Sequence, residues 1–226
     1  MTDLPAFEDF ERRAHAVFAA IPATFREGIS GLIVHTKRVT HPHIDDYETL
    51  GECEADLMGE GDGAERHSTI HLYYGSFVTL GRREKDFDWD WELRETIEHE
   101  IRHHLEDRAG LPDLRRQDWA EEQNEFRHSG KPFDPLFYRA GDEREPDEFW
   151  VDPDCFLEVR LSRRGLSRIA GKLHPVTFGE EVFEVLVPAQ GDDVRYVAIE
   201  GGWVDDDGNG GDLIVVFVTG RGWFRR

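Results

Sequence analysis

Apolar residues recur at spacings of three and four in two stretches of the chain, the pattern of helices that bury one face. The first stretch ends before Pro22 and has its apolar positions at Phe7, Phe10, Ala14, Val17, Phe18 and Ile21. The second repeats every fourth residue, at Leu93, Ile97, Ile101 and Leu105. We expect this second helix to begin near Asp88 or Asp90 and to stop at Gly110, with Pro112 just beyond.

Two other stretches favour strands. The segment "GLIVHTKRV", residues 31–39, is rich in β-branched residues and has the length of a buried strand. Residues 68–81 alternate Ile70 and Leu72 with Thr69 and His71, which predicts a strand with one solvated face. The polar, glycine-rich segment between them, "GECEADLMGEGDGAERHS", predicts irregular structure with a mobile tip at "GEGDGAE".

The pattern changes again in the second half of the chain. Residues 115–151 are polar, contain three prolines and show little periodicity, so we expect a linker or a lid. From Asp152 onward, short β-rich segments follow at intervals of about ten residues: "CFLEVRLS", "GKLHPVTF", "EVFEVLVP", "VRYVAIEGGWV" and "DLIVVFVT". The expected fold class is therefore α+β, with an N-terminal domain at 1–114 and an all-β, sandwich-like domain at 152–226 that could bind peptides.

Composition narrows the list of partners. The formal net charge is -21, from 48 acidic and 27 basic residues, which disfavours nucleic acid and anionic membrane. No apolar run approaches the ~20 residues needed to cross a bilayer, and the acidic N-terminus is unlike a signal peptide, so the expected location is the cytoplasm. Two cysteines, Cys53 and Cys155, predict separate reduced thiols without a role.

The second predicted helix carries His99, Glu100 and His103 in the order His-Glu-x-x-His. Residues four apart lie on one helical face, so both imidazoles can bind one metal ion. In such sites two neutral imidazoles hold zinc, and the glutamate accepts a proton from the water that attacks a carbonyl group. For His104, the next histidine, packing against the sheet is expected rather than metal binding.

These residues also carry a family resemblance. The sequence "TIEHEIRHHLE", preceded in order by "IPATFREGISGLIVHTKRV" and "STIHLYYGSF", resembles the minimal-zincin family of small bacterial metallopeptidase-like proteins over residues 7–113. The resemblance implies that His99 and His103 bind zinc and that Glu100 is the general base. It further implies that the strand at Ile70 to Tyr74 is an edge strand lining a cleft for a polypeptide substrate.

The third metal ligand stays open. Many relatives have a glycine three residues after the second histidine and an acidic ligand three residues further, where this chain has Glu106 and Ala109. Glu106 lies three residues beyond His103 on the same helical face and is the favoured ligand. Asp107, Asp113 and Asp118 are the alternatives.

The C-terminal segment has a second resemblance. Residues 173–218, and "GGDLIVVFV" above all, are similar to the last β-domain of J-protein co-chaperones, although the chain has no J-domain. The segment "DDDGNG", residues 205–210, matches the first half of a calcium loop, but Val216 stands where a glutamate ligand is needed. A solvated β-turn is therefore expected there.

Two functions follow from these observations. The first is a zinc-dependent peptidase whose β-domain holds polypeptide substrate. The second is a non-catalytic, chaperone-associated polypeptide-binding protein on a zincin scaffold. A metal position open to a cleft favours catalysis, whereas a closed or empty site favours the scaffold.

Overall fold

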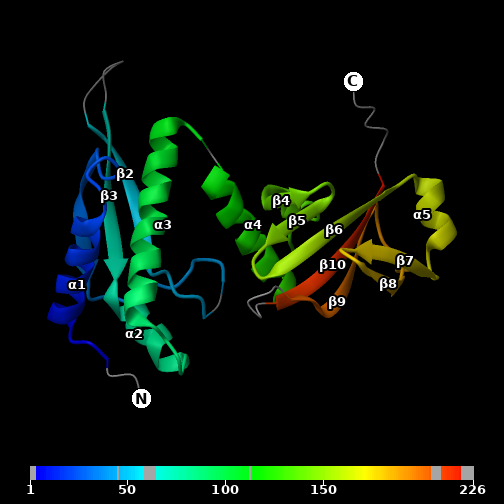
Figure 1. Cartoon of the computed structure of the whole chain (residues 1–226), viewed down its shortest axis with the longest axis horizontal. Helices are drawn as coiled ribbons and strands as arrows, with labels where there is room; N and C mark the ends of the chain where they lie inside the picture. Colours follow the sequence, from blue (N-terminus) through cyan, green and yellow to red (C-terminus); the bar gives the residue numbers. More distant parts are fainter. Residues whose placement is uncertain (1–3, 45, 59–64, 112, 205–209, 220–226) are drawn as a thin grey trace. The chain divides into compact units, whose positions relative to one another are not determined.

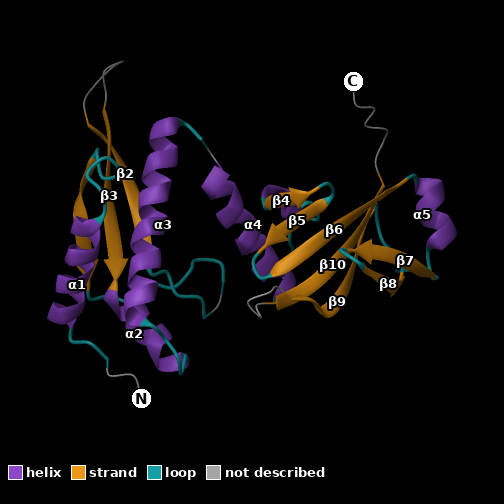
Figure 2. Cartoon of the chain, in the orientation of Figure 1, coloured by secondary structure: helices purple, strands orange, loops and turns teal. Residues whose placement is uncertain are grey.

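The computed structural model describes residues 4–44, 46–58, 65–111, 113–204 and 210–219, and it divides the chain into two compact units, Met1–Arg115 and Arg116–Arg226. Both units contain helices and strands, which confirms the α+β class (Figure 2). None of the described helices is long and apolar enough to cross a membrane.

The first unit is built around a three-stranded sheet (Figure 1). Its strands are β1 (Ile29–His35), β2 (Gly51–Met58) and β3 (Glu65–Tyr73), in the order β1-β3-β2. The central strand β3 runs parallel to β1 and antiparallel to β2. Its helices are α1 (Phe7–Ala20), α2 (Tyr74–Arg83) and α3 (Trp89–Ala109).

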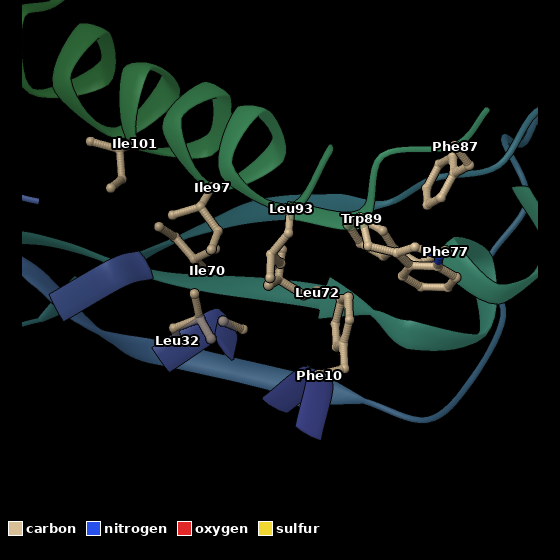
Figure 3. Close-up of a cluster of buried hydrophobic side chains, with 11 residues drawn as sticks. Phe10, Leu32, Ile70, Leu72, Phe77, Phe87, Trp89, Leu93, Ile97 and Ile101 are labelled. Carbon is tan, nitrogen blue, oxygen red and sulfur yellow. The ribbon is translucent and has the colours of Figure 1, made fainter. Parts of the chain in front are cut away.

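The core of this unit lies between the sheet and helices α1 and α3, which also contact each other (Figure 3). Ile70 and Leu72 of β3 are fully buried, and the α3 residues Leu93 and Ile97 pack in the same cluster. Phe10 of α1 adds its ring, 4.9 Å from that of Phe77. The buried residues of α3 are therefore those of the predicted apolar line.

Both predicted amphipathic helices are confirmed. Helix α3 begins after Asp88, whose side chain accepts hydrogen bonds from the backbone N–H groups of Asp90 and Trp91. This cap satisfies donors that the first helical turn leaves unpaired. Gly110 ends the helix in a left-handed conformation with φ 68°, which costs a glycine little.

Two predictions for the first unit are wrong. The segment expected to be irregular forms β2 and the start of β3, because pairing between the two strands keeps its polar residues extended. Of its expected tip, residues 59–65, all but Glu65 lie outside the described residues. The strand predicted at 68–81 stops at Tyr73 and continues as α2. A helix there places Tyr74 and Phe77 against Phe10, an arrangement that strand alternation would prevent.

The second unit contains a five-stranded sheet of order β4-β5-β6-β10-β9 and a separate β7-β8 pair. The strands are β4 (Asp142–Glu145), β5 (Glu148–Val151), β6 (Asp154–Leu161), β7 (Leu173–Phe178), β8 (Glu181–Leu186), β9 (Val194–Val204) and β10 (Gly210–Thr219). Three helical segments accompany them: α4 (Asp113–His128), which begins in the first unit, η1 (Phe137–Ala140) and α5 (Arg163–Ile169).

Strand β10 is buried on both faces. Ile214 and Val216 pack with Phe137 and Phe156 on one face, and Val215 packs with α5 and the β7-β8 pair on the other. The parallel pairing of β10 with β6 places it inside the sheet, which explains its unbroken apolar run.

The five predicted C-terminal strands are confirmed, but two expectations for this half are wrong. Residues 115–151 are not an irregular linker, because they hold most of α4 together with η1, β4 and β5. The unit is not all β, since α4 and α5 belong to it. Apolar periodicity could not predict α4, because part of its packing uses polar side chains: Asn124 and Arg127 donate hydrogen bonds to the buried carboxylate of Asp154. Residues 205–209, most of the expected calcium-like turn, lie outside the described residues.

Replacing Ile70 with alanine should destabilise the first unit by about 2–5 kcal/mol, because a fully buried side chain leaves a cavity in the core. The control is Ile33→Ala in β1, where the side chain is 46% exposed and a much smaller change is expected. Chemical unfolding followed by circular dichroism measures both. Equal losses of stability in the two variants would contradict this core.

Candidate metal site

The imidazoles of His99 and His103 face each other on α3. Their Nε2 atoms are 3.1 Å apart and the ring planes stand at 84°. A tetrahedral zinc ion with bonds of about 2.05 Å holds two nitrogen ligands about 3.3 Å apart. The pair is therefore spaced to share one ion after a small side-chain adjustment.

Glu100 takes a different orientation from the two histidines. It is 6% exposed, and its carboxylate lies beside Gly51, the first residue of β2. On a helix with 100° per residue, Glu100 is about 60° from the buried Ile97, whereas His99 is about 200° away from it. Glu100 is therefore held at the flank of the core while the imidazoles point out of it.

These three side chains line one cavity of about 320 Å³ in the first unit. The wall opposite the helix is the start of β2, and the lining residues are Gly51, Glu52, Cys53, His99, Glu100, His103, Asp107 and Arg115. The site thus combines two potential metal ligands, a buried carboxylate and a strand within one small cavity.

The strand beside the cavity is not the predicted one. Ile70 to Tyr74 was expected to form an edge strand, but β3 is central and pairs with β1 and β2. The edge strand at the cavity is β2. Its segment is polar and rich in glycine, which predicts irregular structure instead of a strand. Only the sheet pairing could reveal which strand has an open edge.

The candidate third ligands lie in different surroundings. The Glu106 carboxylate accepts a hydrogen bond from the backbone N–H of Leu114 at 2.6 Å, in the first turn of α4. Asp107, and not Glu106, is among the described residues that line the cavity, and Asp107 Oδ2 is 2.7 Å from an Arg115 nitrogen. Asp113 is the exposed first residue of α4, and Asp118 lies further along that helix in the second unit.

Helical spacing puts Asp107 on the side of α3 that carries the two histidines. Asp107 is four residues beyond His103, as His103 is beyond His99, so the three form one row along α3. Glu106 lies about 60° from His103 around the helix, and its carboxylate accepts the hydrogen bond from the Leu114 N–H group.

Two further side chains near the site, His104 and Cys53, are placed where metal binding is disfavoured. His104 is 1% exposed, with Nδ1 2.9 Å from Ser68 Oγ and Nε2 2.8 Å from the Glu27 carbonyl, so it packs against the sheet as predicted. Cys53 lines the cavity, which the sequence did not predict. Burial raises the pKa of its thiol, which disfavours the thiolate that would bind metal.

Comparison of this chain with family models found no match, and comparison with curated proteins found none either. Among solved structures, a conserved hypothetical protein from Thermus thermophilus is similar, with 32% sequence identity and a TM-score of 0.40. The similarity covers 46% of this chain and 98% of that protein.

Gly51 should be required for the packing of β2 against α3. A Cβ atom there would lie 2.8 Å from Thr96 Cγ2 and 3.1 Å from Glu100 Oε1. Gly51→Ala should therefore destabilise the first unit by about 1–3 kcal/mol and displace Glu100. Gly31→Ala in β1 is the matched control, because nothing lies within 4 Å of its added Cβ. If both variants unfold at the same denaturant concentration, the close approach is not a constraint.

Proposed function

We propose that this protein is a zinc-dependent hydrolase that cleaves polypeptides at the cavity of the first unit. The observation that carries the proposal is the placement of His99, Glu100 and His103 in one cavity, with the two Nε2 atoms 3.1 Å apart. The resemblance to minimal zincins supports the same assignment. The donor set fits zinc, because imidazole nitrogen is one of its usual ligands.

His99 and His103 would hold the ion, and Glu100 would move the proton. Zinc, when bound, supplies a Lewis acid that polarises a carbonyl group and lowers the pKa of a water molecule. Glu100 would accept the proton of the attacking water and pass it to the leaving amine. Its burial beside Gly51 holds the carboxylate in one position and limits its contact with bulk water.

The edge strand β2 suggests the substrate class. Gly51, Glu52 and Cys53 combine an unpaired strand edge with the wall of the cavity. An extended peptide could pair with that edge through its own backbone, which gives affinity with little dependence on side chains. A polypeptide therefore suits this site better than a compact small molecule.

A non-catalytic polypeptide-binding protein is the second candidate, and an exposed apolar surface in the second unit favours it. Leu173 and Leu186 form a cross-strand pair of the β7-β8 sheet, and they are 62% and 60% exposed. Val182 of β8 is 64% exposed. Such a surface can hold apolar segments of another chain without chemistry, in accord with the resemblance to the J-protein β-domain.

Glu100→Gln tests catalysis directly. The amide cannot accept the proton, so the rate of peptide cleavage should fall about 10²- to 10⁴-fold while the zinc content stays unchanged. The matched control is Glu98→Gln, an exposed position on the same helix, which should keep full activity. The assay should include unfolded polypeptide as well as short peptides. Absence of chelator-sensitive cleavage by zinc-loaded wild-type protein would favour the non-catalytic candidate.

Zinc affinity tests the ligands. His99→Ala and His103→Ala should each abolish binding at this site while the unit stays folded, because its apolar core does not include them. For the third ligand we favour Asp107, which lines the cavity with both histidines and would complete a His–His–Asp donor set suited to zinc.

Among the carboxylates, Asp107→Asn should weaken zinc binding at least about tenfold, as loss of a metal-site group commonly does. Glu106→Gln should leave zinc binding unchanged, since its carboxylate binds the Leu114 N–H group. Competition with a chromophoric chelator measures both variants, and a large loss in Glu106→Gln alone would restore Glu106 as the ligand.

A further inference from the structure

Two carboxylates follow the edge strand that borders the cavity. Cys53 of β2 is the cross-strand partner of the buried Ile70, so it lies on the core face of the sheet. Glu52 pairs with His71, and by strand alternation it shares with Glu54 the opposite face, which we call the outer face. Both glutamates are exposed, and no described strand pairs with the other edge of β2. Two negative charges therefore lie two residues apart beside an open strand edge.

Neither carboxylate is neutralised by a cation of the described residues. Glu52 accepts a hydrogen bond from the Tyr73 hydroxyl. Glu54 Oε2 lies 3.1 Å from His71 Nε2, but that nitrogen makes no hydrogen bond in the described part of the chain. Lys37 lies over the Tyr73 ring, with Nζ 4.7 Å from the ring centre. Because a carboxylate can accept about four hydrogen bonds, both glutamates keep free capacity for a donor.

The cavity beside this strand is acidic as well. Glu52, Glu100 and Asp107 line it, and Arg115 is the basic residue among its described lining. The whole chain has a formal net charge of -21. Such a field attracts cationic ligands, but salt screens it beyond about 8 Å at physiological ionic strength. The charges next to the bound ligand therefore decide selectivity.

A peptide that pairs with the edge of β2 alternates its side chains between the two faces. One set faces α3 and the cavity, and the other set lies on the outer face, each side chain beside its cross-strand partner in β2. The peptide residues opposite Glu52 and Glu54 belong to the outer set and are separated by one residue. Opposite charges in such direct pairs are favourable, whereas like charges repel.

We propose that the protein selects basic polypeptides with lysine or arginine at two positions separated by one residue, and that Glu52 and Glu54 determine this specificity. The inference rests on the proposed function in one respect: the polypeptide must pair with the edge of β2 at the cavity. In the competing arrangement, Glu52 only holds Tyr73 and Glu54 only faces solvent.

Matched peptides test the spacing. Three peptides of equal length differ at two positions, which hold lysines separated by one residue, lysines next to each other, or alanines. Adjacent lysines point to opposite faces of a strand, so only one of them can meet a glutamate. Fluorescence anisotropy measures binding to zinc-loaded Glu100→Gln protein, and wild-type protein is used for cleavage. The separated lysines should bind about 2- to 30-fold more tightly than the alanines, with the adjacent lysines between them.

The variant Glu52→Gln/Glu54→Gln tests the two carboxylates. Its amide oxygens can still accept the Tyr73 hydrogen bond, so the fold should be kept, as circular dichroism can verify. KM for the separated lysines should rise to the value for the alanines while kcat stays unchanged, because the lost contacts do not involve the reacting atoms. Glu8→Gln/Glu98→Gln is the matched control, since it removes the same charge from exposed helical positions and should keep the preference.

The outcomes separate this inference from the hydrolase proposal. If the separated lysines have no advantage over the adjacent ones, or if their advantage survives in Glu52→Gln/Glu54→Gln, the preference is overturned even where cleavage occurs. If wild-type protein cleaves none of the peptides while the Glu100→Gln protein still prefers the separated lysines, the hydrolase proposal fails and this one stands. Absence of both binding and cleavage overturns both.

Discussion

The packing of α3 on the sheet determines the rest of the first unit. Leu93, Ile97 and Ile101 form one line along the helix, and their burial against Ile70 and Leu72 fixes its rotation. With that rotation set, the positions two residues from the line, His99 and His103, must leave the core. Glu100 and His104 lie at the flank of the line and are buried. A hydrophobic constraint thus assigns each polar residue of α3 its environment.

The two faces of the three-stranded sheet in the first unit carry different kinds of side chain. One face carries the core, and the other carries His35, His71 and the carboxylates of β2. Period-two alternation along β3 connects them, because Ile70 and Leu72 cannot be buried without turning His71 to the opposite side. The β2 strand takes part in both surfaces: its first residues line the cavity, and Glu52 is the cross-strand partner of His71. The close approach of Gly51 to Thr96 and Glu100 fixes that strand against α3.

In the second unit, buried charge accompanies the apolar core. Glu158 of β6 is 4% exposed and accepts hydrogen bonds from Tyr138 and Arg139. These contacts stabilise its charged form and hold the pKa of the carboxyl below its ordinary value despite the opposing effect of burial. Asp154, at the start of the same strand, anchors α4 through Asn124 and Arg127. Removing one partner would leave a buried charge uncompensated, so polar residues here are structural.

The sequence by itself determined the features that depend on local periodicity. The α1 and α3 helices, the apolar C-terminal strands and the spacing of His99, Glu100 and His103 all follow from side chains a few residues apart. Tertiary structure decided what depends on pairing between distant segments. Strand pairing made the polar β2 an edge strand. Packing against Phe10 made residues 74–83 a helix, and hydrogen bonds to the buried Asp154 hold α4 in place. Tertiary structure also brought His35 to His71, because two histidines 36 residues apart become neighbours only when their strands pair.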